Sequence, residues 1–386
     1  MSDVESDTEE VTDLSNSDVT TKYRAASDIA QKALLKVIEA CVADADICEI
    51  CELGDNIIEE ATGKLYNKKV KGKAILKGVA FPTCVAVNEV MGNYCPLKGE
   101  STTLKNGDVA KIELACHIDG YVAAAGHTIV VGGEKVEDRR ADAIMAAYQA
   151  AEAAVRLVQV GNKSTVVADT MNKIADEYKC KFVFGATSHQ MKKHVFEGTK
   201  TIMPHQTEEH KAEEFEFEPN EVYGINVVMS TGDGKGKEME VRHTVYKRAP
   251  DVTYLLKTAK ARQFISEISK RYPALPFTLR AFEDQQMARL GVSEAKRHEL
   301  LEEYTVLQEK KGNCVAQFKF TVLLLPGGAK KVTGLPLGEA EKNIVSSLSI
   351  QDEEIKKLLA QPANQSSKAK KKKEKGAKKE EGEAAA

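Results

Sequence analysis

The sequence predicts a mixed α/β (α+β) protein built from two related halves. A phrase of turn, acidic residue and β-branched strand occurs at Asn106–Leu114 and again at Asn220–Val227. Each copy follows a passage with apolar residues at helical spacing, at Ala25–Cys41 and at Ala141–Leu157. Because two copies are too few for a solenoid, we expect one domain with pseudo-twofold symmetry, whose halves meet over a shared cleft.

The expected elements follow from apolar periodicity and from β-branched runs. Helices are expected at four ranges: Lys22–Cys41, Ile47–Tyr66, Ala141–Val158 and Thr165–Tyr178. Strands are expected at five ranges: Val109–Cys116, Tyr121–Thr128, Val222–Met229, Arg242–Tyr246 and Val315–Leu325. Between Leu256 and Gln308 the alternation stops, which predicts a helical insertion over residues 256–308.

Composition and charge limit the kind of protein that this chain encodes. Its 386 residues, 42% of them hydrophobic, suffice for one large globular domain, which we expect over residues 18–360. No apolar run approaches the length of a membrane span, and the acidic start is unlike a secretory signal. We therefore expect no membrane insertion and a location in the cytosol or nucleus, with eight free cysteines.

The two ends of the chain carry opposite charge. Residues 2–18 hold seven acidic residues and no basic one, which predicts a disordered acidic arm over residues 1–17. A low-complexity basic run predicts a disordered lysine-rich tail over residues 361–386. Such a tail either only solubilises the protein or binds the phosphates of RNA and directs the protein to the nucleus. Its candidate RNA-binding residues are Lys368, Lys370, Lys371, Lys372, Lys373, Lys375, Lys378 and Lys379.

The repeated phrase brings one polar side chain from each half toward the expected cleft, since Glu113 and Asn226 occupy equivalent positions. A cleft of this kind can assemble a two-metal hydrolase site, in which carboxylates and a histidine hold two ions a few ångströms apart. Whether it does so here depends on the other residues that reach the cleft.

Five segments, in this order, resemble the type II methionine aminopeptidases: Ala80–Thr83, Lys111–Gly120, Val222–Asn226, Ser230–Gly232 and Val315–Lys319. The resemblance covers residues 18–335 and implies a pita-bread fold, in which residues 256–308 correspond to the helical insertion of the type II enzymes. In that family two Asp, one His and two Glu residues hold two divalent ions.

Position by position, this sequence keeps almost none of that ligand set. The Asp positions fall at Glu113 and Ala124, the His position at His189, and the Glu positions at Asn226 and Lys319. Ala124 has no donor atom, and Asn226 offers only an uncharged carbonyl. An ammonium about 4 Å from a divalent ion is repelled by roughly 8 kcal/mol at an effective dielectric constant of about 20. We therefore expect no dinuclear centre, no other cofactor, and a charge pair between Lys319 and Glu113.

The positions that handle protons in the family are altered as well. Its catalytic His falls at Asn93, and its second active-site His falls at Glu197. Asn cannot titrate, so it cannot act as a general acid or base. The resemblance therefore implies a peptidase scaffold whose chemistry has been lost, and we expect no catalytic residue.

The altered site, the lysine-rich tail and the segment Pro276–Glu283 together resemble the proliferation-associated proteins, also known as ErbB-receptor-binding and curved-DNA-binding proteins. This resemblance runs nearly end to end. It implies a non-catalytic pita-bread protein that associates with RNA and with the large ribosomal subunit, and that moves between nucleolus, nucleus and cytoplasm. It also brings DNA, regulatory proteins and receptor cytoplasmic segments into consideration as partners, and we expect a monomer.

Two further segments are candidate interfaces. Arg262, Arg271 and Arg280 of the insertion would bind structured RNA through its phosphates and shape. The alternative is that these charges, which alternate with acidic residues, only form a solvated surface. Ile355, Leu358 and Leu359 approximate the helical L-x-x-L-L pattern that docks in coregulator grooves, although a terminal helix packed on the body explains the same spacing.

Three functions therefore remain open. The first is a non-catalytic protein that binds RNA and ribosomes. The second is an adaptor linked to transcription, which binds nucleic acid and regulatory proteins. The third is an active metalloaminopeptidase, which Lys319, Ala124 and Asn93 oppose.

Overall fold

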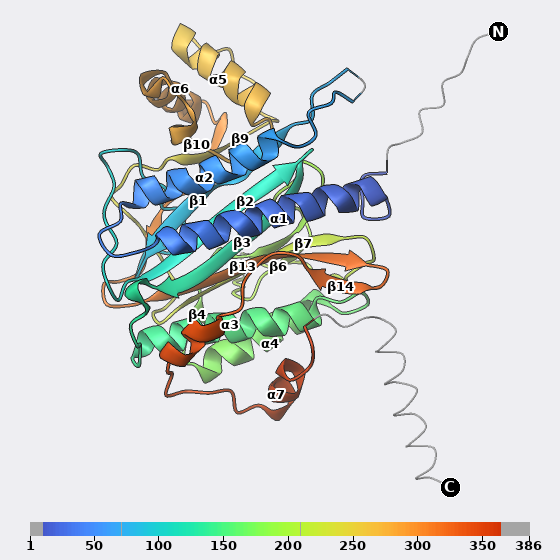
Figure 1. Ribbon diagram of the computed structural model, residues 1–386, viewed down its shortest axis with the longest axis vertical. Helices are drawn as coiled ribbons and strands as arrows, with labels where there is room; N and C mark the ends of the chain where they lie inside the picture. The colour runs from blue at the N-terminus through green and yellow to red at the C-terminus, as the bar shows by residue number, and fades with distance from the viewer. Residues whose placement is uncertain (1–10, 71, 209, 364–386) are drawn as a thin grey trace, which may run out of the picture.

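The computed structural model describes residues 11–70, 72–208 and 210–363 (Figure 1). Its α-helices are α1 (Ser17–Ala40), α2 (Ile47–Gly63), α3 (Arg139–Leu157), α4 (Ser164–Glu177), α5 (Ala259–Arg271), α6 (Gln285–Arg297) and α7 (Glu353–Leu359). Short 3-10 helices are η1 (Val131–Gly133), η2 (Leu279–Ala281) and η3 (Gly338–Asn343). Residues 1–10 of the predicted acidic arm and the basic run at 368–379 lie outside the described residues.

The strands are β1 (Lys77–Val87), β2 (Val109–Ile118), β3 (Tyr121–Val130), β4 (Lys181–Phe182), β5 (Ser188–Met191), β6 (Thr201–Ile202), β7 (Val222–Ser230), β8 (Lys237–Glu238), β9 (Val245–Arg248), β10 (Phe277–Thr278), β11 (Leu301–Glu303), β12 (Leu307–Gln308), β13 (Val315–Leu325) and β14 (Gly328–Lys331). The main sheet has the order β1-β2-β3-β13-β7-β5-β6, with β14 paired to β13 and β4 paired to β7.

The predicted pseudo-twofold arrangement is present in this sheet. Helices α1 and α2 pack against β1, β2 and β3, while α3 packs against β7 and β13 and α4 packs against α3. Figure 1 shows both helix pairs on the same side of the sheet. Strand β13, from the end of the domain, lies between the two halves of the sheet. In the antiparallel register its residue Lys319 is opposite Gly126 of β3 on one side and opposite Asn226 of β7 on the other. The mixed α/β fold predicted from the repeat is therefore confirmed.

The helix boundaries follow from capping. Helix α1 begins at Ser17 and not at the predicted Lys22, because the Asn16 side chain accepts a hydrogen bond from the Asp18 amide at 2.9 Å. Helix α2 begins as predicted at Ile47, where Asp46 accepts from the amides of Cys48 and Glu49. It ends at Gly63, before the predicted Tyr66, whose φ of 49° is incompatible with a helix.

The insertion is less purely helical than the sequence predicts. Helices α5 and α6 pack together around Phe264, and Gly291 allows this approach, because a Cβ there would lie 2.5 Å from the Phe264 side chain. The same segment also contributes strands β10 and β11, which flank β9 in a separate three-stranded sheet. The predicted strand Arg242–Tyr246 is displaced, because β9 begins at Val245.

The two ends of the described chain are packed on the body. Leu14, within the range predicted as an acidic arm, is buried in the core beside Tyr23. At the other end, Ile355 of α7 is 3% exposed, and Leu358 and Leu359 are half-buried against the same cluster as α3. Their apolar face contacts the body, as the alternative of a packed terminal helix predicts, and the docking role of these three residues stays a prediction.

All eight cysteines are free, as predicted, and all eight are buried. Across the described ranges, no helix combines the length and the apolar character that a membrane crossing requires.

Candidate functional site

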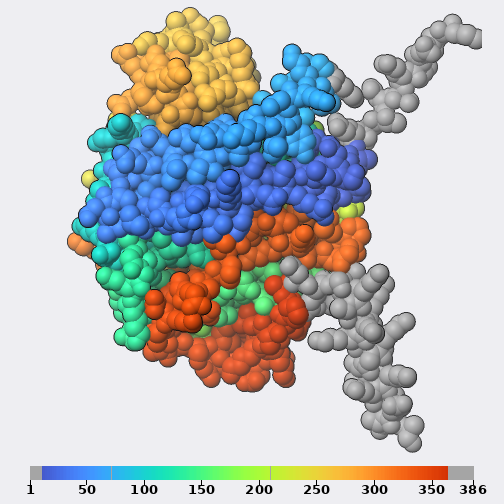
Figure 2. All heavy atoms as spheres, viewed as in Figure 1, coloured from blue at the N-terminus to red at the C-terminus, as the bar shows by residue number. Residues whose placement is uncertain are grey.

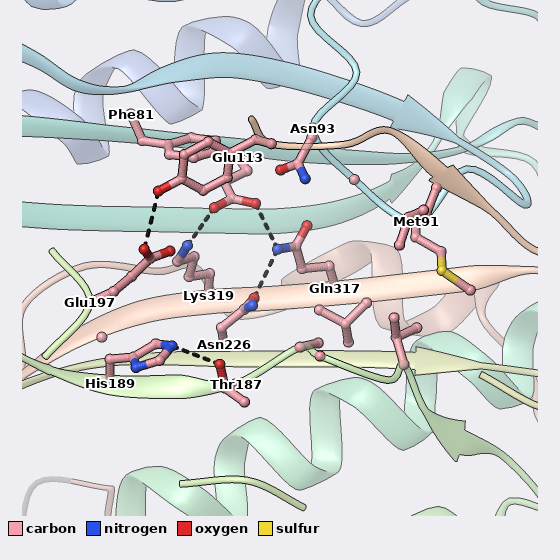
Figure 3. A pocket seen from close by; sticks show the side chains of 18 of the residues that line it. Phe81, Met91, Asn93, Glu113, Thr187, His189, Glu197, Asn226, Gln317 and Lys319 are labelled. Atoms are coloured by element: carbon pink, nitrogen blue, oxygen red, sulfur yellow. Dashed lines mark hydrogen bonds and ion pairs between the residues drawn. The ribbon is translucent and has the colours of Figure 1, made fainter. Parts of the chain in front are cut away.

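A cavity of about 260 Å³ opens on the face of the main sheet opposite the helices (Figure 3). Six of the seven positions predicted for the former active site line it: Asn93, Glu113, His189, Glu197, Asn226 and Lys319. Ala124, the seventh, does not line it. Its side chain is fully buried in a cluster that includes Phe81 and Phe196, both of which border the cavity.

Strand alternation explains why polar side chains meet at this cavity. Ile112 and Leu114 of β2 point into the core beneath α1 and α2, so Glu113 between them faces the other way. In β13, Phe318 and Phe320 join the core beneath α3, which turns Gln317 and Lys319 toward the cavity. Two apolar layers therefore fix the orientation of the central polar residues.

The predicted charge pair is present at the centre of the cavity. Lys319 Nζ donates to Glu113 Oε1, and the side chains of Lys319 and Glu113 are only 11% and 9% exposed. The ammonium also lies 5.5 Å from the ring centroid of Phe81 and 5.0 Å from that of Phe196, within cation–π range. A cation of the protein itself thus pairs with Glu113, the position at which the resemblance implied a metal ligand.

Gln317 extends this pair into a network that the sequence analysis missed. Its Nε2 donates to Glu113 Oε2 at 2.9 Å and to Asn226 Oδ1 at 2.8 Å (Figure 3). The sequence carried a signal for it, because Gln317 is two positions from Lys319 in a predicted strand and must therefore lie on the same face. The amide joins the half that supplies Glu113 to the half that supplies Asn226.

His189 has a partner for each ring nitrogen. Its Nδ1 lies 3.3 Å from the Gly198 carbonyl oxygen, and its Nε2 lies 2.7 Å from Thr187 Oγ1. Because a carbonyl can only accept, the first contact requires the proton on Nδ1, which leaves Nε2 to accept from Thr187. Burial lowers the pKa of His189, so the ring is neutral at physiological pH.

The former proton-handling positions are tied to the segment that follows β11. Glu197 Oε2 accepts from the Tyr304 hydroxyl at 3.2 Å and lies 3.5 Å from Lys247 Nζ. Burial, followed by the charge of Glu197, raises the pKa of Tyr304, so its hydroxyl stays protonated and donates. Asn93 Nδ2 donates to the Thr305 carbonyl at 3.0 Å. Glu197 and Asn93 are thus held by neighbouring residues of one segment, and the Asn93 amide cannot titrate.

The residues present do not fit the two-metal centre implied by the resemblance. Both carboxylate oxygens of Glu113 accept hydrogen bonds, one from Lys319 and one from Gln317, and the Asn226 oxygen accepts from the same amide. Within the described part of the chain, no three His, Cys, Asp or Glu side chains are grouped closely enough to hold an ion. A hard divalent cation would need anionic oxygens that this arrangement does not offer.

The arginines predicted to bind RNA do not form one surface. Arg280 is buried, with 5% of its side chain exposed, and its Nη2 donates to Asp55 Oδ2 of α2 at 2.5 Å. The prediction for Arg280 is therefore wrong, because this side chain joins the insertion to the body. Arg271 is 45% exposed and pairs with Glu267 at 2.9 Å, while Arg262 donates to the carbonyls of Leu256 and Lys257.

Comparisons with known proteins agree with this geometry. A family model described as metallopeptidase family M24 matches residues 17–248. The chain is 45% identical over 379 residues to ErbB-3 binding protein 1 of Solanum tuberosum, covering 98% of this chain and 96% of the relative. It is 44% identical over 369 residues to proliferation-associated protein A of Dictyostelium discoideum (94% and 93% covered). It is 36% identical over 358 residues to the curved DNA-binding protein of Schizosaccharomyces pombe (90% and 91%).

Two solved structures place the fold. A thermophilic Arx1 has a TM-score of 0.83 at 31% identity and covers 91% of this chain and 100% of its own. Methionine aminopeptidase from Thermotoga maritima has a TM-score of 0.55 at 16% identity, covering 82% and 96%, and supports the fold alone. The resemblance inferred from the sequence is thereby confirmed, and so is the pita-bread fold.

Proposed function

We propose, from the premise that this chain belongs to metallopeptidase family M24 and to its proliferation-associated branch, that it is a binding protein and not a peptidase. Its ligands are RNA and ribosomal particles. By binding the large ribosomal subunit, the protein serves growth, ribosome production and translation. It acts in the cytoplasm, the nucleus and the nucleolus. No catalytic residue and no metal or other cofactor takes part.

One observation carries the loss of catalysis: Lys319 and Gln317 saturate the carboxylate of Glu113. A metallopeptidase needs a metal-bound water as nucleophile and a group that transfers protons. Here the anionic ligand is already neutralised, and Asn93 and Glu197 are bonded to Thr305 and Tyr304. The cavity therefore supports neither half of the hydrolytic chemistry.

Binding to RNA is supported by charge and by kinship. The lysine-rich tail offers many cations that neutralise phosphates. The fission-yeast relative, 36% identical over most of both chains, is named for binding curved DNA. Proteins that bind nucleic acid through backbone phosphates commonly bind both kinds, because phosphate contacts carry no sequence information.

A second function is favoured by the names of other relatives. The potato relative, at 45% identity, is named for binding the receptor ErbB-3, and this supports regulatory proteins or receptor cytoplasmic segments as partners. A transcription-linked adaptor would use nucleic acid and protein contacts together, so this function coexists with the first.

Crosslinking of the full chain to RNA in cells, combined with polysome fractionation, tests the proposal. We expect the protein to crosslink to ribosomal RNA and to sediment with large subunits, and sedimentation to weaken as salt is raised. A chain that crosslinks to no RNA and stays at the top of the gradient at low salt would overturn the RNA-binding function. Retention of a receptor segment by the same preparation would then favour the adaptor.

A further inference from the structure

We propose that the segment between α2 and β1, residues 64–70 and 72–77, binds the phosphate backbone of duplex RNA. We call this segment the lysine hairpin. Its described residues include Lys64, Lys68, Lys69, Lys73 and Lys77 and no acidic residue. The inference rests on the proposed function and names a surface that would carry it.

The lysine hairpin projects from the body and is held together by its own hydrogen bonds. It leaves α2 after Gly63, protrudes from the body in Figures 1 and 2, and returns to β1 at Lys77. Near its tip Val70 and Lys73 exchange both backbone hydrogen bonds, at 2.9 and 3.0 Å. At its base Lys77 Nζ donates to the Leu65 carbonyl and to Asn67 Oδ1. These bonds hold the two arms together, so its charges are presented from a defined element.

Four of its cations are available to a ligand. Lys64, Lys68, Lys69 and Lys73 are exposed, and no carboxylate of the described residues lies within ion-pair distance of them. A phosphate can therefore contact them without first breaking an ion pair to any residue that the structure describes. Only Lys77 is occupied, and it is the residue that closes the base.

The insertion presents its charges differently. Arg271 pairs with Glu267, Arg280 with Asp55, Arg289 with Glu100 and Lys296 with Glu303. Four of the nine cations in residues 256–308 are therefore neutralised by neighbours, and a phosphate contact at those four would have to compete with a carboxylate. The same range carries seven acidic residues, whereas the described residues of the lysine hairpin include none. Because its lysines are not interspersed with carboxylates, the lysine hairpin is the stronger candidate for an anionic partner.

The side chains favour duplex RNA over other anionic partners. The hairpin contains lysines and no arginine, and an ammonium acts on phosphate as a point charge without reading bases. Its one aromatic residue, Tyr66, packs on the core cluster beneath α1 and α2 and is not free to stack on bases. Without an exposed aromatic ring it also lacks the usual anchor to a lipid interface, although Leu65, Val70 and Leu76 are exposed.

The base of the hairpin lies at the same end of the molecule as the insertion (Figure 1). Glu59 of α2 and Val79 of β1 line a second cavity, of about 260 Å³, together with Arg271 and Tyr272 at the end of α5. The hairpin therefore extends the end of the molecule that carries the insertion. A duplex lying on this end would be within reach of the hairpin lysines.

Two fourfold variants of the full chain separate this role from net charge. The test variant carries Lys64→Gln, Lys68→Gln, Lys69→Gln and Lys73→Gln. The control carries the same change at four exposed lysines that already have a carboxylate partner, namely Lys36, Lys135, Lys163 and Lys342. Binding of a duplex RNA, an oligouridine and phosphatidylserine vesicles is measured at two salt concentrations, after the unfolding midpoints of both variants are matched to the wild type.

We expect the test variant to lose duplex affinity about tenfold or more, with the log–log salt slope reduced by about 2 to 3, at roughly 0.9 for each phosphate contact. The control should stay within about twofold of the wild type, and oligouridine binding should change less than duplex binding. Equal losses in the two variants would overturn the proposal, as would a loss confined to vesicles or to oligouridine.

The result also separates this inference from the function on which it rests. If the wild type binds duplex RNA and the test variant binds it equally well, the hairpin assignment fails and the proposed function stands. If the wild type itself binds neither RNA nor ribosomes, both fail.

Discussion

Lysines are central to both the cleft and the lysine hairpin, but the cleft lysine is buried and ion-paired whereas the hairpin lysines are exposed. In the cleft, Lys319 is 11% exposed, pairs with Glu113 and lies against two aromatic rings. In the hairpin, Lys64, Lys68, Lys69 and Lys73 are exposed, and no described carboxylate pairs with them. A cation whose partner lies inside the protein stabilises the fold, whereas a cation without one is free for a partner from outside. The following variants test that difference, from the largest expected effect to the smallest.

Lys319→Met should destabilise the protein by about 3 to 5 kcal/mol, because it leaves Glu113 buried without its counter-charge. Chemical unfolding measures this, and Lys342→Met is the control, since Lys342 is 73% exposed and its pair with Glu339 is solvated. The double variant Lys319→Met with Glu113→Leu should recover much of the loss. A midpoint for Lys319→Met that equals that of the control would show that the pair contributes nothing.

Lys111 is a buried lysine that donates to the Asn88 carbonyl at 3.0 Å, and no carboxylate of the described ranges pairs with it. Burial lowers the pKa of Lys111 from 10.5 to about 8. Between these values the unfolded chain holds a proton that the folded chain has lost, so stability rises with pH. Relative to Lys111→Met, the wild type should gain up to about 3 kcal/mol between pH 7 and pH 10. A stability difference that is constant across this range would contradict the interpretation.

Arg280→Met should cost about 2 to 3 kcal/mol of stability, less than for Lys319 because Asp55 is 16% exposed and partly solvated. Folded Arg280→Met protein should still bind RNA like the wild type, because the guanidinium is not at the surface. Arg271→Met, at a 45% exposed position, serves as the comparison. A selective loss of RNA binding in Arg280→Met, with stability unchanged, would restore the role that the sequence suggested.

Gln317→Leu should have the smallest effect, about 1 to 2 kcal/mol, because it leaves one oxygen of Glu113 and the Asn226 oxygen without a donor. Gln317→Glu is the sharper variant, since it adds a second carboxylate beside Glu113. Differential scanning calorimetry of both variants should rank Gln317→Glu below Gln317→Leu. The reverse order would mean that Lys319 neutralises both carboxylates.

The sequence was sufficient for the scaffold and for the pair at its centre. Apolar periodicity located α1 to α4, and strand alternation makes Glu113 and Lys319 face one cavity, which the resemblance had already implied. Gln317 was missed although the same alternation applies to it, because the family comparison directs attention to former ligands only. A residue with no counterpart in the enzymes' ligand set is visible only when every inward-facing position of a strand is considered.

The insertion shows where sequence reasoning fails. Basic residues on amphipathic helices look alike in sequence, yet Arg280 is buried against Asp55 of α2, a partner 225 positions away. Tertiary packing decides which cations are free, and no local pattern reports it. The same limit applies to α7, where an L-x-x-L-L spacing describes a face that is covered by the body. The sequence also did not single out the hairpin lysines, because only the folded structure shows that no described carboxylate lies close enough to pair with them.

Metal analysis is the most direct test of the claim that this cleft has exchanged metal chemistry for an internal ion pair. The full chain is soaked in cobalt or manganese, desalted and assayed for bound ions, and Met-Ala-Ser peptide is offered to the same sample. We expect well under one ion per chain and no release of methionine. Two tightly held ions per chain, with methionine release that chelator abolishes, would contradict the account.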